Sequence, residues 1–319
     1  FRSGEVPSRR QGLPRHAALA VSGVPRADRV RTTLDLPLQI EVERLAAAER
    51  SKFAGAAALA LVVAEVSGDI RAIVTAGGGS LDLTQAVRSP GSALKPFIYA
   101  MAFQDGVAAP QTRMEDVPRR FGAYAPENFD RGFAGAVTAG EALRRSLNLP
   151  AVALLEKVGP QRFAAVLRNA GVTLRMAPGA AASLPLALGG AGLSLREAMG
   201  LYTALAADGR VAPLRLLAGE GGQRDFLGPR AAALTAEELT QNFPDGGRAG
   251  VAWKTGTSWG GRDAWAMGFD ARHVVGVWIG RPDGTPLPGA TGARMALPVL
   301  ARVMELVPAA PLQGLRPRP

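Results

Sequence analysis

The alternation of apolar and polar positions predicts strands near both ends of the chain and helices between them. Residues 32–53 carry apolar side chains at helical spacing, with Asp35 placed as an N-cap and Pro37 in the first turn. Two apolar runs that contain β-branched residues, 57–66 and 69–79, flank a Ser-Gly turn. This part of the chain therefore predicts a helix followed by a β-hairpin.

The middle of the chain has mainly helical periodicity. Residues 92–104 predict one helix, residues 138–170 several short consecutive helices, and residues 194–207 a further helix that ends before a Gly. Residues 210–249 have weak periodicity and many Gly and Arg residues. We expect this last region to form variable loops.

The last third returns to short apolar runs separated by Gly-rich or polar turns. Residues 251–257, 263–270 and 273–280 predict strands, and residues 292–306 predict a final helix. Strands, then helices, then strands again indicate an α+β fold. We expect one antiparallel sheet, completed by both ends of the chain and flanked by helices, with an all-helical block inserted.

The amino-acid composition limits which catalytic groups and metal ligands the chain can use. The 319 residues are 47% hydrophobic, which is enough for a large core, and no apolar run is long enough to span a membrane. The absence of cysteine excludes disulfides and thiol catalysis, and only His16 and His273 are available for a metal or a triad. We therefore expect no metal and no cofactor, and a serine enzyme would need another base.

The net charge of +10 has two interpretations. A basic chain can bind an anionic partner, or it can simply have a solvated basic surface. The Arg residues are spread along the chain and do not alternate with aromatic residues as they would on a nucleic-acid platform. This favours the second interpretation, and we expect no nucleic-acid partner.

The first chemical motif is Ser92-Ala93-Leu94-Lys95, at the start of a predicted helix. Residues three apart are neighbours on a helix surface, so Lys95 Nζ can reach Ser92 Oγ. A buried lysine, or one beside a second cation such as Lys254, loses its proton more easily and can act as a base. Taken alone, the motif is better explained by a helix cap at Ser92 and a solvated lysine in the first turn.

The second motif, Ser146-Leu147-Asn148, lies between two predicted helices. A hydroxyl can relay a proton there, and an amide can orient a peptide group, because an amide both donates and accepts. Without other signals, two capping residues explain the same pattern.

The third motif, Lys254-Thr255-Gly256-Thr257, ends a predicted strand. Gly256 removes a side chain where a substrate must approach the backbone, and an edge strand can pair with an extended peptide. The lysine and threonines offer donors for a terminal carboxylate. An edge strand carrying a protective lysine is the alternative explanation.

Taken together, the motifs and their flanks resemble the transpeptidase domain of a class A penicillin-binding protein, most closely the 1C type. The resemblance covers roughly residues 28–306 and predicts a penicillin-binding-protein/serine β-lactamase-like fold. The flanks that carry it are Thr32-Thr33-Leu34-Asp35, Arg88-Ser89-Pro90-Gly91, Lys95-Pro96-Phe97, the run 124–130, the run 145–150, Leu188-Gly189-Gly190 and the run 253–258.

This resemblance implies a catalytic role for each motif. Ser92 would be acylated by the penultimate D-Ala carbonyl of a stem peptide, with release of the last D-Ala, and Lys95 would be the general base. Ser146, with Lys254 nearby, would relay a proton to the leaving amine. An amine from a second stem peptide would then attack the acyl-enzyme.

The same resemblance implies how the substrate is held. Asn148 would orient the donor peptide, and the backbone N–H groups of Ser92 and Thr257 would form the oxyanion hole. Thr255 and Thr257, on either side of Gly256, would hold the carboxylate of the substrate or of a β-lactam.

Domain limits and partners follow from the same comparison. We expect a linker at residues 1–27, a transpeptidase domain at 28–308 and a Pro-rich tail at 309–319. The implied partners are stem peptides of peptidoglycan, glycan derived from lipid II, and β-lactams. We also expect the chain to belong to a longer, membrane-anchored protein with a glycosyltransferase domain, acting on the periplasmic side.

Four alternatives remain, of which three use the same residues and one does not. A D,D-carboxypeptidase would replace the acceptor amine by water. A class A β-lactamase would add a deacylating Glu, but no Glu-x-x-Leu-Asn segment lies between Asn148 and Lys254. A non-catalytic penicillin-binding sensor or scaffold would keep the serine without turnover, and a polyanion-binding module would make all three motifs accidental.

Overall fold

The computed structural model describes residues 31–53, 55, 57–79, 81–219 and 221–312. The predicted linker at 1–27 and most of the tail at 309–319 lie outside these residues. The first tail residues stay on the domain, because Ala271 donates its N–H to the carbonyl of Ala310 (2.7 Å). No described helix is long and apolar enough to cross a membrane.

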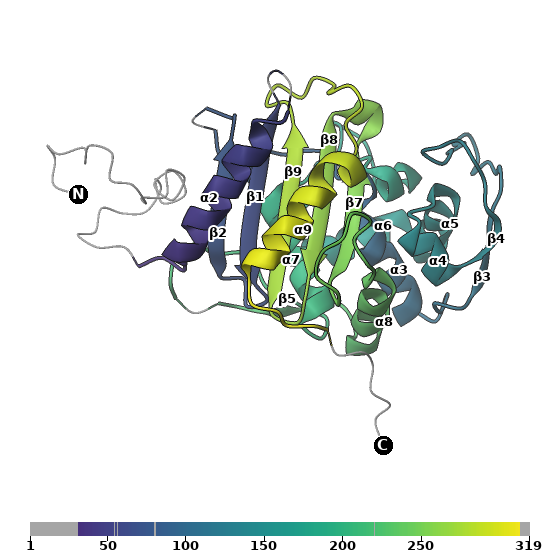
Figure 1. Cartoon of the computed structure of the whole chain (residues 1–319). Coiled ribbons are helices and arrows are strands. Elements are labelled where there is room, and N and C mark those ends of the chain that lie inside the picture. Colours follow the sequence, from purple (N-terminus) through teal and green to yellow (C-terminus); the bar gives the residue numbers. More distant parts are fainter. Residues whose placement is uncertain (1–30, 54, 56, 80, 220, 313–319) are drawn as a thin grey trace, which may run out of the picture.

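In the described residues, one five-stranded antiparallel sheet has the order β2-β1-β9-β8-β7 (Figure 1). Its strands are β1 (Ala58–Glu65), β2 (Ile70–Ala76), β7 (Ala252–Thr257), β8 (Asp263–Phe269) and β9 (His273–Gly280). β1 pairs with β9 along its whole length, so the two ends of the chain meet at the centre of the sheet. This confirms the predicted hairpin, the C-terminal strands and the α+β fold.

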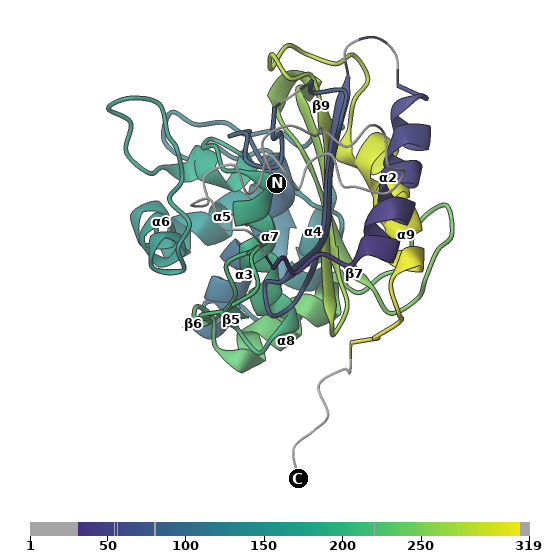
Figure 2. The same cartoon turned by 90° about the vertical axis from the view of Figure 1, so that its left-hand side faces the viewer.

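Helices cover both faces of the sheet, as the edge-on view shows (Figure 2). α2 (Leu36–Arg50) and α9 (Leu297–Leu306) lie on one face, and the helical block lies on the other. β1 divides its side chains accordingly, because successive residues of a strand face opposite sides. Leu59, Leu61 and Val63 pack on the α2–α9 side, while Ala58, Ala60, Val62 and Ala64 pack against the block.

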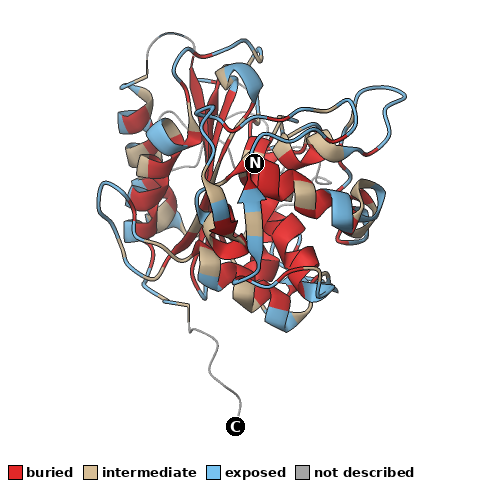
Figure 3. Ribbon diagram, turned by 90° about the vertical axis from the view of Figure 1, so that its right-hand side faces the viewer, coloured by how far each residue is buried: buried red, intermediate tan, exposed pale blue. Residues whose placement is uncertain are grey.

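The helical block surrounds α3, whose residues from Lys95 to Phe103 are all buried. Buried residues concentrate where its helices face one another and the sheet (Figure 3). The block contains α3 (Lys95–Gln104), α4 (Ala139–Arg144), α5 (Asn148–Val158), α6 (Pro160–Asn169), α7 (Leu195–Ala206) and α8 (Pro229–Leu239), with the hairpin of β3 (Arg113–Asp116) and β4 (Gly135–Thr138) at its outer side.

The expectation of loops throughout residues 210–249 was wrong. This region contains α8 and a short strand pair, β5 (Arg210–Val211) with β6 (Arg224–Asp225). Pro229 starts α8 in its first turn, where a missing N–H costs nothing. The buried residues of α8 recur at helical spacing, at positions 231, 232, 235, 236 and 239, so a helical pattern is present within residues 229–239. The Gly and Arg residues around this segment dominate the composition of the region as a whole and conceal the pattern.

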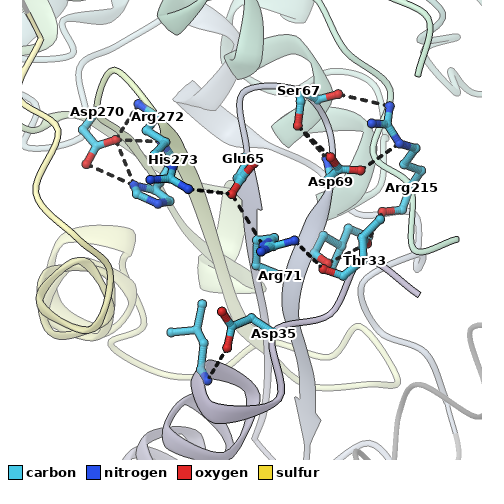
Figure 4. Close-up of polar contacts among 12 residues, drawn as sticks. Thr33, Asp35, Glu65, Ser67, Asp69, Arg71, Arg215, Asp270, Arg272 and His273 are labelled. Carbon is cyan, nitrogen blue, oxygen red and sulfur yellow. Dashed lines mark hydrogen bonds and ion pairs between the residues drawn. The ribbon is translucent and has the colours of Figure 1, made fainter. Parts of the chain in front are cut away.

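A polar network ties the N-terminal segment to the sheet edge (Figure 4). Asp35 caps α2 as predicted, accepting from the N–H of Leu38 (3.1 Å). Thr33 donates its hydroxyl to the carbonyl of Ile70 (2.8 Å), and Arg215 pairs with Asp69 (2.8 Å). The segment before α2 is therefore fixed against the β1–β2 hairpin.

The outer edge of the sheet is protected by a side chain of α2. Gln39 is buried, donates to the carbonyl oxygen of Ile73 (2.9 Å) and accepts from its N–H (2.8 Å). β2 is an edge strand, so these two backbone groups face no further strand. Gln39 replaces the missing ladder partner and satisfies both groups.

We expect Gln39→Leu to lower the free energy of unfolding by about 2–4 kcal/mol, because it leaves a buried N–H and a buried carbonyl unsatisfied. Glu41→Leu, at an exposed position of the same helix, should change it by less than about 0.5 kcal/mol. Urea unfolding followed by circular dichroism measures both. Equal effects for the two variants would contradict this account of the edge.

Candidate active site

Ser92 lies in a short 3-10 turn (Gly91–Leu94) that leads directly into α3. Two large buried side chains hold the turn through its carbonyls. Tyr202 of α7 donates to Ala93 (2.7 Å), and the indole of Trp265 of β8 donates to Ser89 (2.8 Å). The serine is therefore presented by a turn anchored to both the sheet and the helical block.

Glycines allow this turn to lie against the end of β7. Gly91 has φ +53°, and a Cβ there would overlap the backbone of Thr257. A Cβ at Gly256 would overlap the carbonyl oxygen of Pro90. The sequence interpretation of Gly256 named the substrate as the close neighbour, whereas the close neighbour in the structure is the serine turn. Gly256 also lines the cleft beside Ser92.

Lys95 joins the first motif to the second. Its side chain is 0% exposed, and Nζ donates to the carbonyls of Ser146 (2.6 Å) and Leu147 (3.1 Å) and to Oδ1 of Asn148 (2.6 Å). These three oxygens satisfy all the hydrogens of an ammonium group. Ser92 Oγ has no hydrogen-bond partner among the described residues, although the spacing had predicted contact with Lys95.

Lys254 joins the third motif to the same serine of the second. It is 2% exposed, and Nζ donates to Ser146 Oγ (2.7 Å) and to the carbonyl of Thr255 (2.8 Å). Ser146 thus contacts both lysines, through its hydroxyl and through its carbonyl. All three motifs, which lie far apart in the sequence, meet at this residue.

Burial changes the ionisation of both lysines. It lowers the pKa of Lys254 to about 7. Burial, followed by the charge of Lys254, holds the pKa of Lys95 well below its usual value, and the charge of Asp116 acts in the opposite direction. The expectation that Lys254 acts as the second cation therefore agrees with this arrangement.

Ser146 has a strained backbone, with φ +60°. Its N–H donates to the carbonyl of Leu143 (3.0 Å) and that of Leu147 to Ala142 (2.9 Å), the Schellman pattern that ends α4. The residue at this point is usually glycine, because a side chain is disfavoured in the left-handed region. A serine here gives up stability and gains a hydroxyl that contacts Lys254.

A cleft of about 820 Å³ opens above these groups. Lys95 and Lys254 are not among its lining residues and lie buried beneath its floor. Site residues of all three motifs line it: Ser92, Ser146, Asn148, Thr255, Gly256 and Thr257. The structure therefore brings all eight predicted site residues together, six at the surface of the cleft and two below it.

The binding motif lies on the free edge of the sheet, because β7 is the last strand in the order. Thr257 Oγ1 accepts from the N–H of Gly292 (3.0 Å), which leaves its hydroxyl hydrogen available to another acceptor. Asn148 donates its amide to the carbonyl of Glu127 (2.6 Å) while Oδ1 accepts from Lys95. Residues of the edge strand and this asparagine both line the cleft.

Two buried polar residues that support the site were missed from the sequence: Asn128, which lines the cleft, and Asp116, which lies outside its lining. Asn128 accepts from the N–H of Asn148 (2.7 Å) and donates to Asp116 (2.8 and 2.9 Å). Asn128 appeared only as part of a resembling flank, and nothing in the local pattern marked Asp116. No group of three metal-ligating side chains occurs within residues 31–312 as far as they are described.

Comparison with known proteins agrees with this geometry. Residues 58–258 match the penicillin-binding protein transpeptidase domain. The chain is 43% identical to penicillin-binding protein 1C of Escherichia coli over 302 residues (89% of this chain, 39% of that protein). It is 33% identical to penicillin-binding protein 1B of Vibrio cholerae over 317 residues (87% and 40%).

Among solved structures, the PonA1 protein from Mycobacterium tuberculosis in complex with penicillin V has the same fold, with a TM-score of 0.76 and 22% identity over 91% of this chain and 92% of that one. The chain belongs to the penicillin-binding protein transpeptidase family. Within that family it is similar to class A proteins, including the 1C type that the sequence motifs had indicated. It spans about two fifths of the length of these relatives.

We expect Ser146→Gly to be more stable than Ser146→Ala by about 1 kcal/mol, because both lose the hydroxyl but only glycine relieves the left-handed strain. At the exposed Glu237 of α8, the order should reverse, since alanine favours a helix interior over glycine by about 1 kcal/mol. Thermal unfolding of the four variants measures both differences. If the alanine variant were more stable than the glycine variant at position 146 as well as at position 237, Ser146 would carry no strain.

We expect Lys254→Met to be more stable than the wild type at pH 6, by a few kcal/mol, with the gain shrinking as the pH rises from about 7 to 10. The lysine pKa is about 7 when folded and about 10.4 when unfolded. The unfolded chain therefore binds the extra proton in this range, and wild-type stability increases with pH. Unfolding midpoints at several pH values test this, with exposed Lys157→Met as the pH-independent control.

Proposed function

We propose that this domain is a D,D-transpeptidase that cross-links peptidoglycan stem peptides through an acyl ester on Ser92, and that β-lactams acylate the same serine. The observation that carries the proposal is the buried Lys95–Ser146–Lys254 arrangement beneath a cleft that Ser92 lines. It provides a base of lowered pKa without histidine.

In the first step, neutral Lys95 accepts the proton of Ser92. A neutral amine has two hydrogens and one lone pair, so Lys95 then releases one of its three oxygen partners and turns its lone pair to Ser92 Oγ. The oxygen bonds to the penultimate D-Ala carbonyl carbon. The peptide C–N bond breaks, and the leaving amine takes the proton of Ser146, which Lys254 replaces.

The substrate lies along the free edge of β7. The hydroxyls of Thr255 and Thr257 bind the terminal carboxylate, and the N–H groups of Ser92 and Thr257 stabilise the oxyanion. The close approach of the Gly91 turn to the backbone of Thr257 supports this pairing of N–H groups. Asn148, which both donates and accepts, orients the donor peptide from the opposite wall.

The lining of the cleft argues against a class A β-lactamase. Its acidic lining residues are Glu127 and Asp130, both exposed at the rim. An acyl ester on Ser92 therefore has no buried carboxylate in the lining to activate water, as a class A β-lactamase requires. The presence of both Lys95 and Lys254 beside Ser146 likewise favours turnover of a peptide substrate over a purely sensing role.

The complete protein extends this proposal, because the chain spans only part of its relatives. We place the domain on the periplasmic side of the membrane, in a protein with a membrane anchor and a glycosyltransferase domain. Its substrates there would be stem peptides on glycan derived from lipid II.

We expect a fluorescent penicillin to label the wild type at one molecule per chain and Ser92→Ala not at all, because the alanine has no nucleophile. Gel fluorescence and intact mass measure the adduct. Ser67→Ala, a serine on the remote β1–β2 turn, should label like the wild type. Labelling of folded Ser92→Ala would reject the acyl-serine assignment.

The acceptor is tested with a pentapeptide donor and a D-amino acid amine. Transpeptidation gives the amide product with loss of D-Ala, whereas a carboxypeptidase gives only the shortened peptide. Exclusive hydrolysis at saturating amine would replace the transpeptidase proposal by the carboxypeptidase alternative. Rapid loss of the penicillin adduct from the protein, measured by intact mass, with release of penicilloate would instead indicate a β-lactamase.

A further inference from the structure

Asp116 is a buried carboxylate behind the active site. It ends β3, is 0% exposed, and has no lysine or arginine within ion-pair distance in the described part of the chain. Its oxygens accept from Asn128 Nδ2 (2.9 and 2.8 Å) and from the N–H of Ala134 (2.8 Å). A buried charge without an ion partner is costly, and the rest of the fold gives no evident reason to keep one.

Asn128 connects this carboxylate to the second motif. It is 5% exposed, and while Nδ2 donates to Asp116 and to the carbonyl of Gly132 (2.8 Å), Oδ1 accepts from the N–H of Asn148 (2.7 Å). Asn148 in turn accepts from Lys95 through its own side chain (2.6 Å). Asp116, Asn128, Asn148 and Lys95 therefore form one continuous hydrogen-bonded row.

This row compensates for a weak helix start. The N-cap of α5 is Leu147, whose side chain cannot accept a hydrogen bond. Asn128 supplies the missing acceptor from another segment and satisfies the first free N–H of α5. Only residues 145–147 separate α4 from α5, and Ser146 among them is strained. A shift at the start of α5 would therefore displace Ser146 as well.

We propose that Asp116 and Asn128 are positioning residues of the transfer reaction, which hold Asn148 and the strained Ser146 turn against Lys95 and place a fixed negative charge behind that lysine. The inference rests on the proposed acyl transfer. It assigns a role to a buried pair of which Asn128 lines the cleft and contacts Asn148, while Asp116 lies outside the lining of the cleft.

The electrostatic part of this role has a defined sign. The charged groups that act on Lys95 are Lys254 on β7 and Asp116 at the end of β3. The buried phenol of Tyr99 lies further along α3 and is influenced by Asp116. Lys254 lowers the pKa of Lys95 and Asp116 raises it. Burial, followed by the charge of Asp116, raises the pKa of Tyr99, so this phenol stays neutral. Removing the charge of Asp116 leaves Lys254 unopposed.

The test measures the second-order rate constant of acylation by a fluorescent penicillin between pH 5 and 9, per titratable active site. Asp116→Asn should move the acid limb of this pH–rate profile to lower pH, by about 0.5–1 unit, because Lys95 loses its proton more easily without the carboxylate. Asn128→Ala should keep the limb in place and reduce the rate about 10-fold or more, because it frees Asn148 without removing the charge.

Glu115→Gln is the matched control, since it removes an exposed carboxylate one residue away and should change neither limb nor rate. If the pair had only a structural role, Asp116→Asn and Asn128→Ala would both lower the unfolding temperature. The molecules that remain folded would still be acylated at the wild-type rate, and the acid limb of their pH–rate profile would lie at the wild-type pH. That result would overturn the proposal.

An exchange variant covers the case in which the single variants do not fold. In Asp116→Asn with Asn128→Asp, Asn at 116 can still accept from Ala134 and donate to Asp at 128, which can accept from Asn148. The negative charge now lies closer to Lys95, so the acid limb should move to higher pH than in the wild type. A folded exchange variant with an unchanged limb would also overturn the proposal.

Discussion

The structure depends on the burial of two lysines against one serine. Lys95 and Lys254 lie beneath the cleft floor and both contact Ser146, so neither can keep its proton as easily as in water. Burial lowers the pKa of both amines, and the charge of Lys254 lowers that of Lys95 further. A free base thereby becomes available in a chain whose one described histidine, His273, lies on β9 beside Asp270, away from the cleft. The remaining features of the site serve to hold this pair.

Holding the pair requires three distant segments to meet with little freedom. Lys95 lies 51 residues before Ser146, and Lys254 lies 108 residues after it. The sheet provides the rigid part, since β7 carries Lys254 and also supports the serine turn through the contact between Gly91 and Thr257. The helical block provides the rest, through the short connection between α4 and α5. The cleft therefore lies where sheet and block meet.

The features that follow local rules could be predicted from the sequence. The cap at Asp35, the hairpin and the three C-terminal strands each have a signal within a few residues. The eight residues that the motifs predicted for the site do lie together at the cleft, and the roles assigned to them come from resemblance and not from spacing. α8 was missed because the Gly and Arg residues around it conceal a helical pattern of only eleven residues, and Asp116 because its role depends on Asn128, twelve residues away in a separate loop. Gly256 was chosen correctly for a different reason, since the backbone that approaches it belongs to residue 90.

The instability of this protein is concentrated where its chemistry is proposed to occur. Two desolvated lysines, a serine in the left-handed region and a buried carboxylate all lie within one hydrogen-bonded region. Each of them lowers the stability of the fold, so selection for stability alone would replace it by a residue without this cost. The surrounding framework offsets these costs by ordinary means: a sheet covered on both faces, a tyrosine and a tryptophan that anchor the serine turn, and a glutamine that satisfies the sheet edge. Because strain persists only where its surroundings leave no alternative, the fully satisfied contacts of Ser146 and Asp116 explain how the arrangement survives. The stability of the sheet and its surrounding framework thus offsets the destabilising groups at the cleft.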